Sequence, residues 1–247
     1  MTLLTAQARI LVRKEIRQLL RSRGALTTSL ILPVIFLVVV PAVQYFSFQS
    51  GGTSSGIPGA APPGLAGLKA GGVVIYYLVP MFTALSGVVM PSVTSLYTIV
   101  QERERKTVEL LVALPVRLTD IIYAKLAATL LVALGVMLPL FAIQAVGVLV
   151  LGAAGPAWVA AELLLLGCAM ACSICLSFVL ALLARDFRTS QQINGFLIMP
   201  ILIVVNAVLL LLPAPIKVPV LAVLLLVLGL VTLAVALRRL TFERYLS

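Results

Sequence analysis

Six long apolar stretches run through the sequence, and each is long enough to cross a bilayer as a helix. They occupy residues 26–48, 72–100, 126–151, 158–184, 193–212 and 218–237. A spanning helix needs about 20 predominantly apolar residues, and a helix satisfies its own backbone hydrogen bonds within lipid. Of the 247 residues, 62% are hydrophobic and 11% are charged, whereas soluble domains carry about 25% charged residues. The sequence therefore predicts an all-α integral membrane protein with six transmembrane helices in a single domain, 1–247.

The basic residues lie almost entirely on one side of the predicted membrane. With six spans both termini share a side, and sixteen of the eighteen Lys and Arg residues fall in segments on that side. Only Lys69 and Lys217 fall on the other side. Because cytoplasmic loops are enriched in Lys and Arg, we expect both termini in the cytoplasm. The net charge of +10 is then a consequence of topology, and nucleic acid is not expected as a partner.

Residues 2–23 form a basic amphipathic segment. Arginines recur there at every fourth position, which gathers them on one side of a helix, and mainly apolar residues occupy the other side. These arginines are Arg9, Arg13, Arg17 and Arg21. The pattern predicts an interfacial helix that lies on the membrane surface in contact with lipid. The alternative is a positively charged flank that only sets the topology.

The charged segment 101–117 connects the second and third predicted spans on the cytoplasmic side. Val108, Leu111 and Val112 form one apolar stripe of a short helix, and Pro115 ends that helix. A helix of this kind, held between two spans, suits the docking of a soluble partner. An ordinary solvated loop helix would show the same pattern.

The order of residues in this segment resembles the cytoplasmic loop of permease subunits in the type-two ABC exporter family. That loop reads Glu-Arg-Glu, then Gly-Thr, then Glu, two leucines and Pro. The matching residues are Glu102, Arg103, Glu104, Thr107, Glu109, Leu110, Leu111 and Pro115. Lys106 stands where the family usually has glycine, and 212–219 is too short for the re-entrant helices of larger members. The basic N-terminal helix and the ending Phe242-Glu243-Arg244 are also similar to that family's elbow helix and tail.

The resemblance implies a permease subunit of an ATP-driven exporter in the cytoplasmic membrane of a prokaryote. Two copies, identical or different, would form the translocation pathway, and each would bind a separate cytoplasmic ATPase. The residues implied to couple to that ATPase are Glu102, Arg103, Glu104, Thr107, Glu109, Leu111 and Pro115. The chain itself is not expected to be an enzyme or to hold a cofactor, since it lacks a Walker A motif; ATP and Mg would bind the partner.

Polar side chains inside the predicted spans are candidates for lining the pathway. They are Thr94, Ser95, Asn194 and Asn206, with Gln44 and Gln144 as further amides. Amides can instead hydrogen-bond between helices, and Ser or Thr can bond the backbone of its own helix. Apolar walls with scattered amides suit an amphipathic or hydrophobic cargo.

Two further features are more easily explained by structure than by chemistry. Glu162 follows Trp158 about one turn into its span, which favours a position near the membrane interface and the positive end of the helix. Cys168, Cys172 and Cys175 share a helix face, but the chain has no histidine to complete a site, so we expect packing rather than a metal.

Two other functions remain as alternatives. A secondary transporter or channel that needs no ATP would usually carry paired ionisable groups at the middle of the membrane, and the sequence shows none there. A membrane enzyme acting on lipid would need a carboxylate pair or a lysine in a pocket. The acidic residues cluster instead in the cytoplasmic segments.

Overall fold

The computed structural model describes residues 31–43, 46, 70–104, 118–150, 152, 154–183 and 187–239. All regular structure in these residues is helical, as predicted. The predicted interfacial helix, 2–23, and most of the predicted coupling segment, 105–117, lie outside the described residues.

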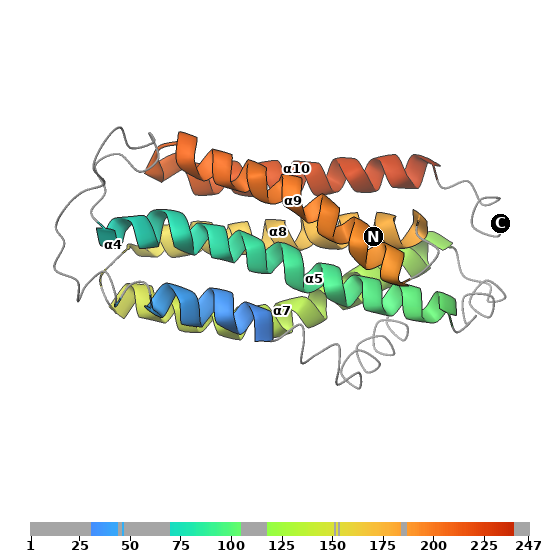
Figure 1. Ribbon diagram of the computed structural model, residues 1–247, viewed down its shortest axis with the longest axis horizontal. Helices are drawn as coiled ribbons and strands as arrows, with labels where there is room; N and C mark the ends of the chain where they lie inside the picture. Colours follow the sequence, from blue (N-terminus) through green and yellow to red (C-terminus); the bar gives the residue numbers. More distant parts are fainter. Residues whose placement is uncertain are drawn as a thin grey trace.

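The chain runs through helices that lie side by side along one long axis (Figure 1). The first described helix, Ile31–Val43, contains the π-helical segment η1, Ile35–Val39. The next is one unbroken helix made of α4, Ala70–Val73, the π-helical segment η2, Val74–Leu78, and α5, Val79–Glu104. It is followed by α7, Leu118–Val150, α8, Pro156–Leu183, α9, Phe187–Leu211, and α10, Ala214–Arg239.

Five of these helices are long and apolar enough to cross a membrane. The stretches are Gly71–Ser95, Leu126–Val150, Pro156–Ser177, Gln192–Leu211 and Ala214–Val235, and Ile31–Val43 is a shorter apolar helix. Large apolar side chains on α7, α9 and α10 are exposed, with Phe196 80% and Val150 79% accessible. Such surfaces are suited to lipid rather than water. The count of six spans stays a prediction.

Several helices extend beyond the predicted apolar stretches. Helix α9 begins at Phe187 rather than at 193, and α10 begins at Ala214 rather than at 218. Pro215 is tolerated because amide hydrogens in the first turn of a helix have no partner within it. Residues 101–104 continue α5 instead of starting a separate helix, because Gln, Glu and Arg favour helix and no helix-breaking residue intervenes.

Helix α8 lies at the centre of the packing, behind α5 in Figure 1, with α5 and α10 as its main neighbours. Two glycines allow these contacts to be close. A Cβ added to Gly229 of α10 would come within 2.7 Å of the Cα of Cys172, and one added to Gly87 of α5 within 2.8 Å of the Ala169 Cβ. Small residues let helix backbones approach in membranes, where packing contributes much of the association energy.

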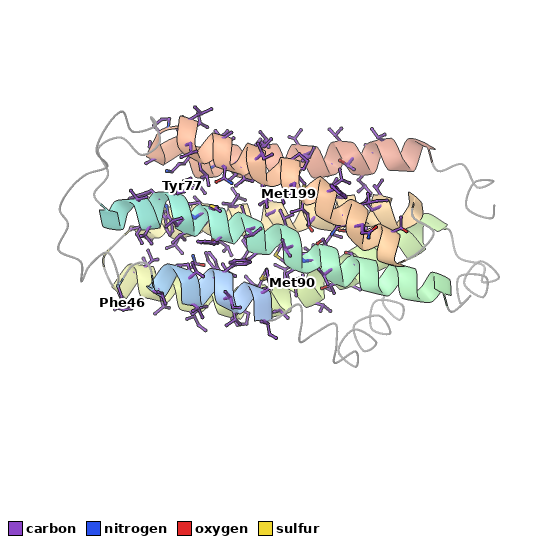
Figure 2. All side chains as sticks on the ribbon, viewed as in Figure 1. Phe46, Tyr77, Met90 and Met199 are labelled. Atoms are coloured by element: carbon purple, nitrogen blue, oxygen red, sulfur yellow. The ribbon has the colours of Figure 1, made fainter. Side chains whose placement is uncertain are left out.

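The side chains form two cores that share α5 and α8. One core joins α5, α8, α9 and α10, and includes Cys172 and Leu221. The other joins η1, α5, α7 and α8, and includes Leu37 and Met90. In Figure 2, Tyr77 lies on the side of its helix toward α9, and Met90 on the side toward α7. Stacking of Phe36 on Phe82, with ring centroids 5.5 Å apart, adds to the contact between η1 and α5.

Prolines explain the local departures from α-helical geometry. The π-helical segments end two residues before Pro41 and Pro80, and a proline leaves the carbonyl four residues earlier without its usual partner. Within α5, Pro91 also interrupts the ladder, and the hydroxyl of Ser173 on α8 donates a hydrogen bond to the nearby carbonyl of Val88. Neighbouring side chains commonly satisfy the backbone in this way around prolines in membrane helices.

Candidate functional site

The Glu-Arg-Glu run lies at the end of α5, as a direct continuation of a membrane-spanning helix. Glu104 is the last residue of α5, and α7 begins at Leu118. The ends of α5 and α10 lie at the same end of the bundle in Figure 1. The other predicted coupling residues, Thr107, Glu109, Leu111 and Pro115, lie outside the described residues, as do Arg9, Arg13, Arg17 and Arg21.

Two candidate pathway residues on α5 are buried in the bundle. Thr94 is 3% exposed, and its hydroxyl donates a 3.0 Å hydrogen bond to the carbonyl of Met90 one turn earlier. Ser95 is also buried. A hydroxyl that bonds its own helix in this way is one of the two interpretations that the sequence leaves open.

The two candidate amides on α9 have different surroundings. Asn206 accepts a 2.8 Å hydrogen bond from the hydroxyl of Tyr77, and its amide group donates a 2.9 Å bond to the carbonyl of Leu202. Asn206 therefore links α9 to η2, which is the role expected of an interhelical amide. Asn194 lies more than three turns away on the same helix and is buried. The two amides thus do not belong to one polar site.

A buried charged cluster joins α5, α8 and α10. Glu162 on α8 and Lys217 on α10 are both 0% exposed, and their opposite charges interact. The Thr83 hydroxyl on α5 also interacts with the Glu162 carboxylate. The approach is too loose for a full hydrogen bond: among the described residues, neither carboxylate oxygen nor this hydroxyl has a hydrogen-bond partner.

This cluster changes the interpretation of both charged residues. Glu162 lies near the start of α8, as expected, but its side chain is enclosed by the bundle rather than placed at a wet interface. The sequence places Lys217 in the connection before the last span, on the outer side. The structure includes it in the first turn of α10, because that helix begins three residues before it, and it packs toward α8.

The three cysteines are free thiols, of which Cys168 and Cys172 are buried. Cys172 belongs to the core and lies against the backbone of Gly229. Within the described part of the chain, no group of three or more His, Cys, Asp or Glu side chains is arranged to hold a metal. Cys172 thus serves as a small packing residue at the α8–α10 contact.

Comparison with known families decides the class of protein. Residues 9–241 match the family described as ABC-2 family transporter protein. The chain belongs to the ABC-2 transporter family. Neither a curated protein nor a solved structure matches the chain. The resemblance seen in the sequence is thereby confirmed.

Membership of the ABC-2 family defines the chain as a permease, the non-catalytic membrane subunit of a transporter. The multi-pass helical bundle agrees with this role. The match spans the Glu-Arg-Glu end of α5 and all of α7 to α10. The buried Glu162–Lys217 pair of this ABC-2 permease was missed by sequence reasoning. The sequence does contain a sign of this pair. Glu162 is the only charged residue between positions 126 and 184, and Lys217 is the only charged residue between positions 189 and 237.

Proposed function

We propose that this permease forms the translocation pathway of an ATP-driven exporter as one of two membrane subunits. A separate cytoplasmic ATPase would bind segment 101–117, and the interfacial helix 2–23 would lie against both the membrane and this partner. Both termini face the cytoplasm in this arrangement, and the membrane is the cytoplasmic membrane of a prokaryote. An amphipathic or hydrophobic cargo suits the apolar helices.

The observation that carries the proposal is the continuity of the helix from Ala70 to Glu104. A force applied at Glu102 or Glu104 acts on the end of a helix that also spans the membrane. Close packing at Gly87 and the bond from Ser173 to Val88 join this helix to α8. Closure of an ATPase dimer would therefore move α5 and α8 together as a rigid body.

The position of the buried charges supports an ATP-driven mechanism over an ion-coupled one. Ion-coupled transporters place their ionisable sites near the middle of the membrane, often at broken helices. Glu162 is the seventh residue of α8 and Lys217 the fourth of α10. Both are therefore within about 10 Å of the start of their helices, which favours a role in packing at one end of the bundle.

Recovery of the partner is the first test. The tagged chain is purified in mild detergent, and the proteins that accompany it are identified by mass spectrometry. A stoichiometric protein with a Walker A motif is expected. Repeated recovery of the chain alone, as an intact dimer, would contradict the proposal and would favour flux assays without ATP.

The coupling role is then tested on the same complex. A double variant, Glu102→Ala with Glu104→Ala, is expected to insert normally but to lose the ATPase or the coupling of hydrolysis to transport. Gln101→Ala changes the same end of α5 without removing a charge and serves as the matched control. Normal ATPase binding and transport in the double variant would remove these glutamates from the mechanism.

A further inference from the structure

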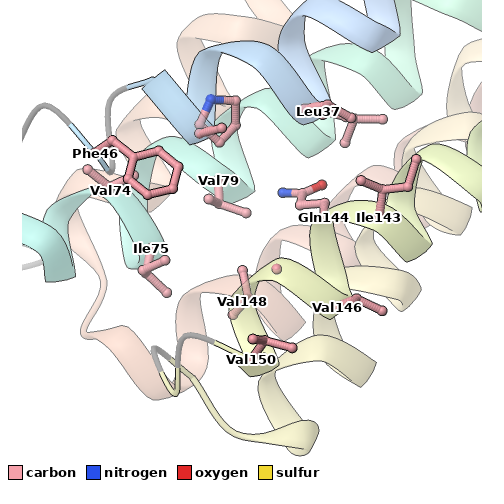
Figure 3. A pocket seen from close by; sticks show the side chains of 14 residues that line it. Leu37, Phe46, Val74, Ile75, Val79, Ile143, Gln144, Val146, Val148 and Val150 are labelled. Atoms are coloured by element: carbon pink, nitrogen blue, oxygen red, sulfur yellow. The ribbon is translucent and has the colours of Figure 1, made fainter.

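A pocket of 470 Å³ lies between three helical segments at one end of the bundle (Figure 3). Its walls come from the helix that contains η1, from η2 with the start of α5, and from α7. Aliphatic side chains make most of the surface, among them Leu37, Ile75 and Val148. Sites for small molecules commonly enclose about 300–1,000 Å³ and are mainly apolar with a few polar groups.

Among the described residues that line this pocket, Gln144 supplies the polar group. Its side chain is 9% exposed, and Figure 3 shows its amide directed into the pocket. Both amide atoms are buried, and neither has a hydrogen-bond partner among the residues that the structure describes. An unsatisfied buried amide destabilises the protein, because its atoms lose their hydrogen bonds to water and gain none in return. A ligand that both accepts and donates a hydrogen bond would recover that cost.

The pocket also lies between the two π-helical segments. Leu37 and Val38 belong to η1, and Val74 and Ile75 to η2. The amide of Val79 bonds the carbonyl of Val74, five residues back, and Val40 bonds Ile35 in the same way. Such single π turns are frequent at functional sites. Two of the three walls of the pocket therefore contain a π turn whose residues line the pocket.

The pocket is suited to an uncharged molecule that comes from the bilayer. None of the described residues that line it is charged, and an ion inside it would gain no compensating group from them. Ile143 and Val146 line it and are also 57% and 58% exposed. Since lipid surrounds these outer faces in a membrane, a molecule dissolved in the bilayer can reach the pocket from the side.

We propose that this pocket binds the acyl chain of a neutral glycerolipid from the bilayer. The Gln144 amide group donates to the ester carbonyl of the lipid, and the Gln144 carbonyl accepts from its free hydroxyl. The aliphatic walls hold the chain. This site is independent of ATPase coupling and goes beyond the proposed transport function.

The test uses the full-length protein in nanodiscs and a monoacylglycerol that carries a diazirine in its acyl chain. After irradiation, mass spectrometry is expected to locate the label on residues 143–150 and 74–79, and unlabelled monoacylglycerol is expected to compete. Ala42→Trp fills the pocket from an exposed position at its edge and should lower labelling about tenfold. Ala160→Trp, also exposed but on α8 and outside the lining, is the matched control.

A second pair of variants tests the polar contact. Gln144→Leu keeps the size of the side chain and removes the amide, and it should reduce labelling at least fivefold, the equivalent of about 1 kcal/mol. Gln192→Leu makes the same change at an exposed position of α9 and should leave labelling unchanged. Equal labelling of Gln144→Leu and Gln192→Leu would remove the amide from the site.

Three results would overturn the proposal. The first is equal labelling of the Ala42→Trp and Ala160→Trp proteins. The second is labelling by a cationic alkylammonium diazirine that matches the neutral probe, because it would contradict selection for an uncharged ligand. The third is a disulfide between two copies at Val146→Cys in a background without native cysteines, together with no labelling. A second copy of the chain would then cover the pocket.

Discussion

Glu162 of α8 and Lys217 of α10 are fully buried, and their opposite charges interact across a helix contact close to the ends of both helices. Charged residues inside membrane bundles are costly unless they have a partner of opposite sign. Their interaction therefore helps to hold both residues in the bundle, and the pair links α8 to α10 at the end of the bundle opposite the Glu-Arg-Glu run (Figure 1).

Removal of one member of this pair is expected to destabilise the protein more than removal of both. Glu162→Gln or Lys217→Met removes the opposite charge beside a buried ionisable group, and breaking a buried pair in this way costs roughly 3–5 kcal/mol. The double variant removes both members of the pair and should recover much of the loss. The stability of the three variants is measured by heating them in detergent and recording the fraction of protein that stays monodisperse. Thr232→Val is the control, because the hydroxyl of Thr232 bonds the carbonyl of Leu228 on its own helix. Simple addition of the two single effects would show that the charges are not coupled.

Substitution at Gly229 is expected to separate α10 from α8. The added methyl group of Gly229→Ala would meet the backbone of Cys172 at 2.7 Å, and overpacking of this kind costs roughly 1–3 kcal/mol. Gly135→Ala on α7 is the matched control, because a Cβ there meets nothing within 4 Å and a helical alanine is favoured by about 0.5–1 kcal/mol. The unfolding temperature should therefore fall in Gly229→Ala and rise in Gly135→Ala. A fall of similar size in both would refute the close-packing argument.

The hydrogen bond between Tyr77 and Asn206 predicts a non-additive pair of substitutions. Tyr77→Phe and Asn206→Leu each remove the same 2.8 Å contact between η2 and α9, so the double variant should lose little more than either single one. Such bonds within membrane proteins are worth about 0.6 kcal/mol on average. A double-mutant cycle in thermal stability measures the coupling. If transport fell in Asn206→Leu while stability stayed constant, Asn206 would line the pathway instead.

The proposed topology predicts opposite accessibility for two introduced cysteines. In a background with Cys168→Ala, Cys172→Ala and Cys175→Ala, Ser54→Cys lies in the proposed outer loop and Ser247→Cys in the proposed cytoplasmic tail. A maleimide that cannot cross membranes should label the first in intact cells, and the second only after the cells are opened. Labelling of both positions in intact cells would exclude a common cytoplasmic side for the termini.

The existence of the helices was predictable, whereas their ends were not. Runs of about 20 apolar residues require spanning helices for purely physical reasons. The helices continue past these runs, as α9 does to Phe187 and α5 to Glu104, because backbone hydrogen bonding does not stop where hydrophobicity does. Composition therefore indicates the membrane-spanning part of a helix and not the whole helix.

The buried charge pair could not be predicted from hydrophobic patterns. Helices that are apolar on every side give no sign of which side faces a neighbour. The orientation of α10 against α8 depends on the fit of Gly229 to Cys172, a contact between residues distant in the sequence. Asn206 shows the same difficulty, since its partner Tyr77 lies 129 residues away.

The π turns before Pro41 and Pro80 mean that a single proline can determine how one part of a helix is rotated relative to the next part. A π turn accommodates one residue more than an α turn, so the segments on its two sides are turned relative to each other by about 100°. If Pro80→Ala let the α-helical pattern return, Val74 and Ile75 would swing away from Gln144 while α5 stayed in place. Substitution of one side chain would then place a different set of residues against Gln144, although the chain keeps its length.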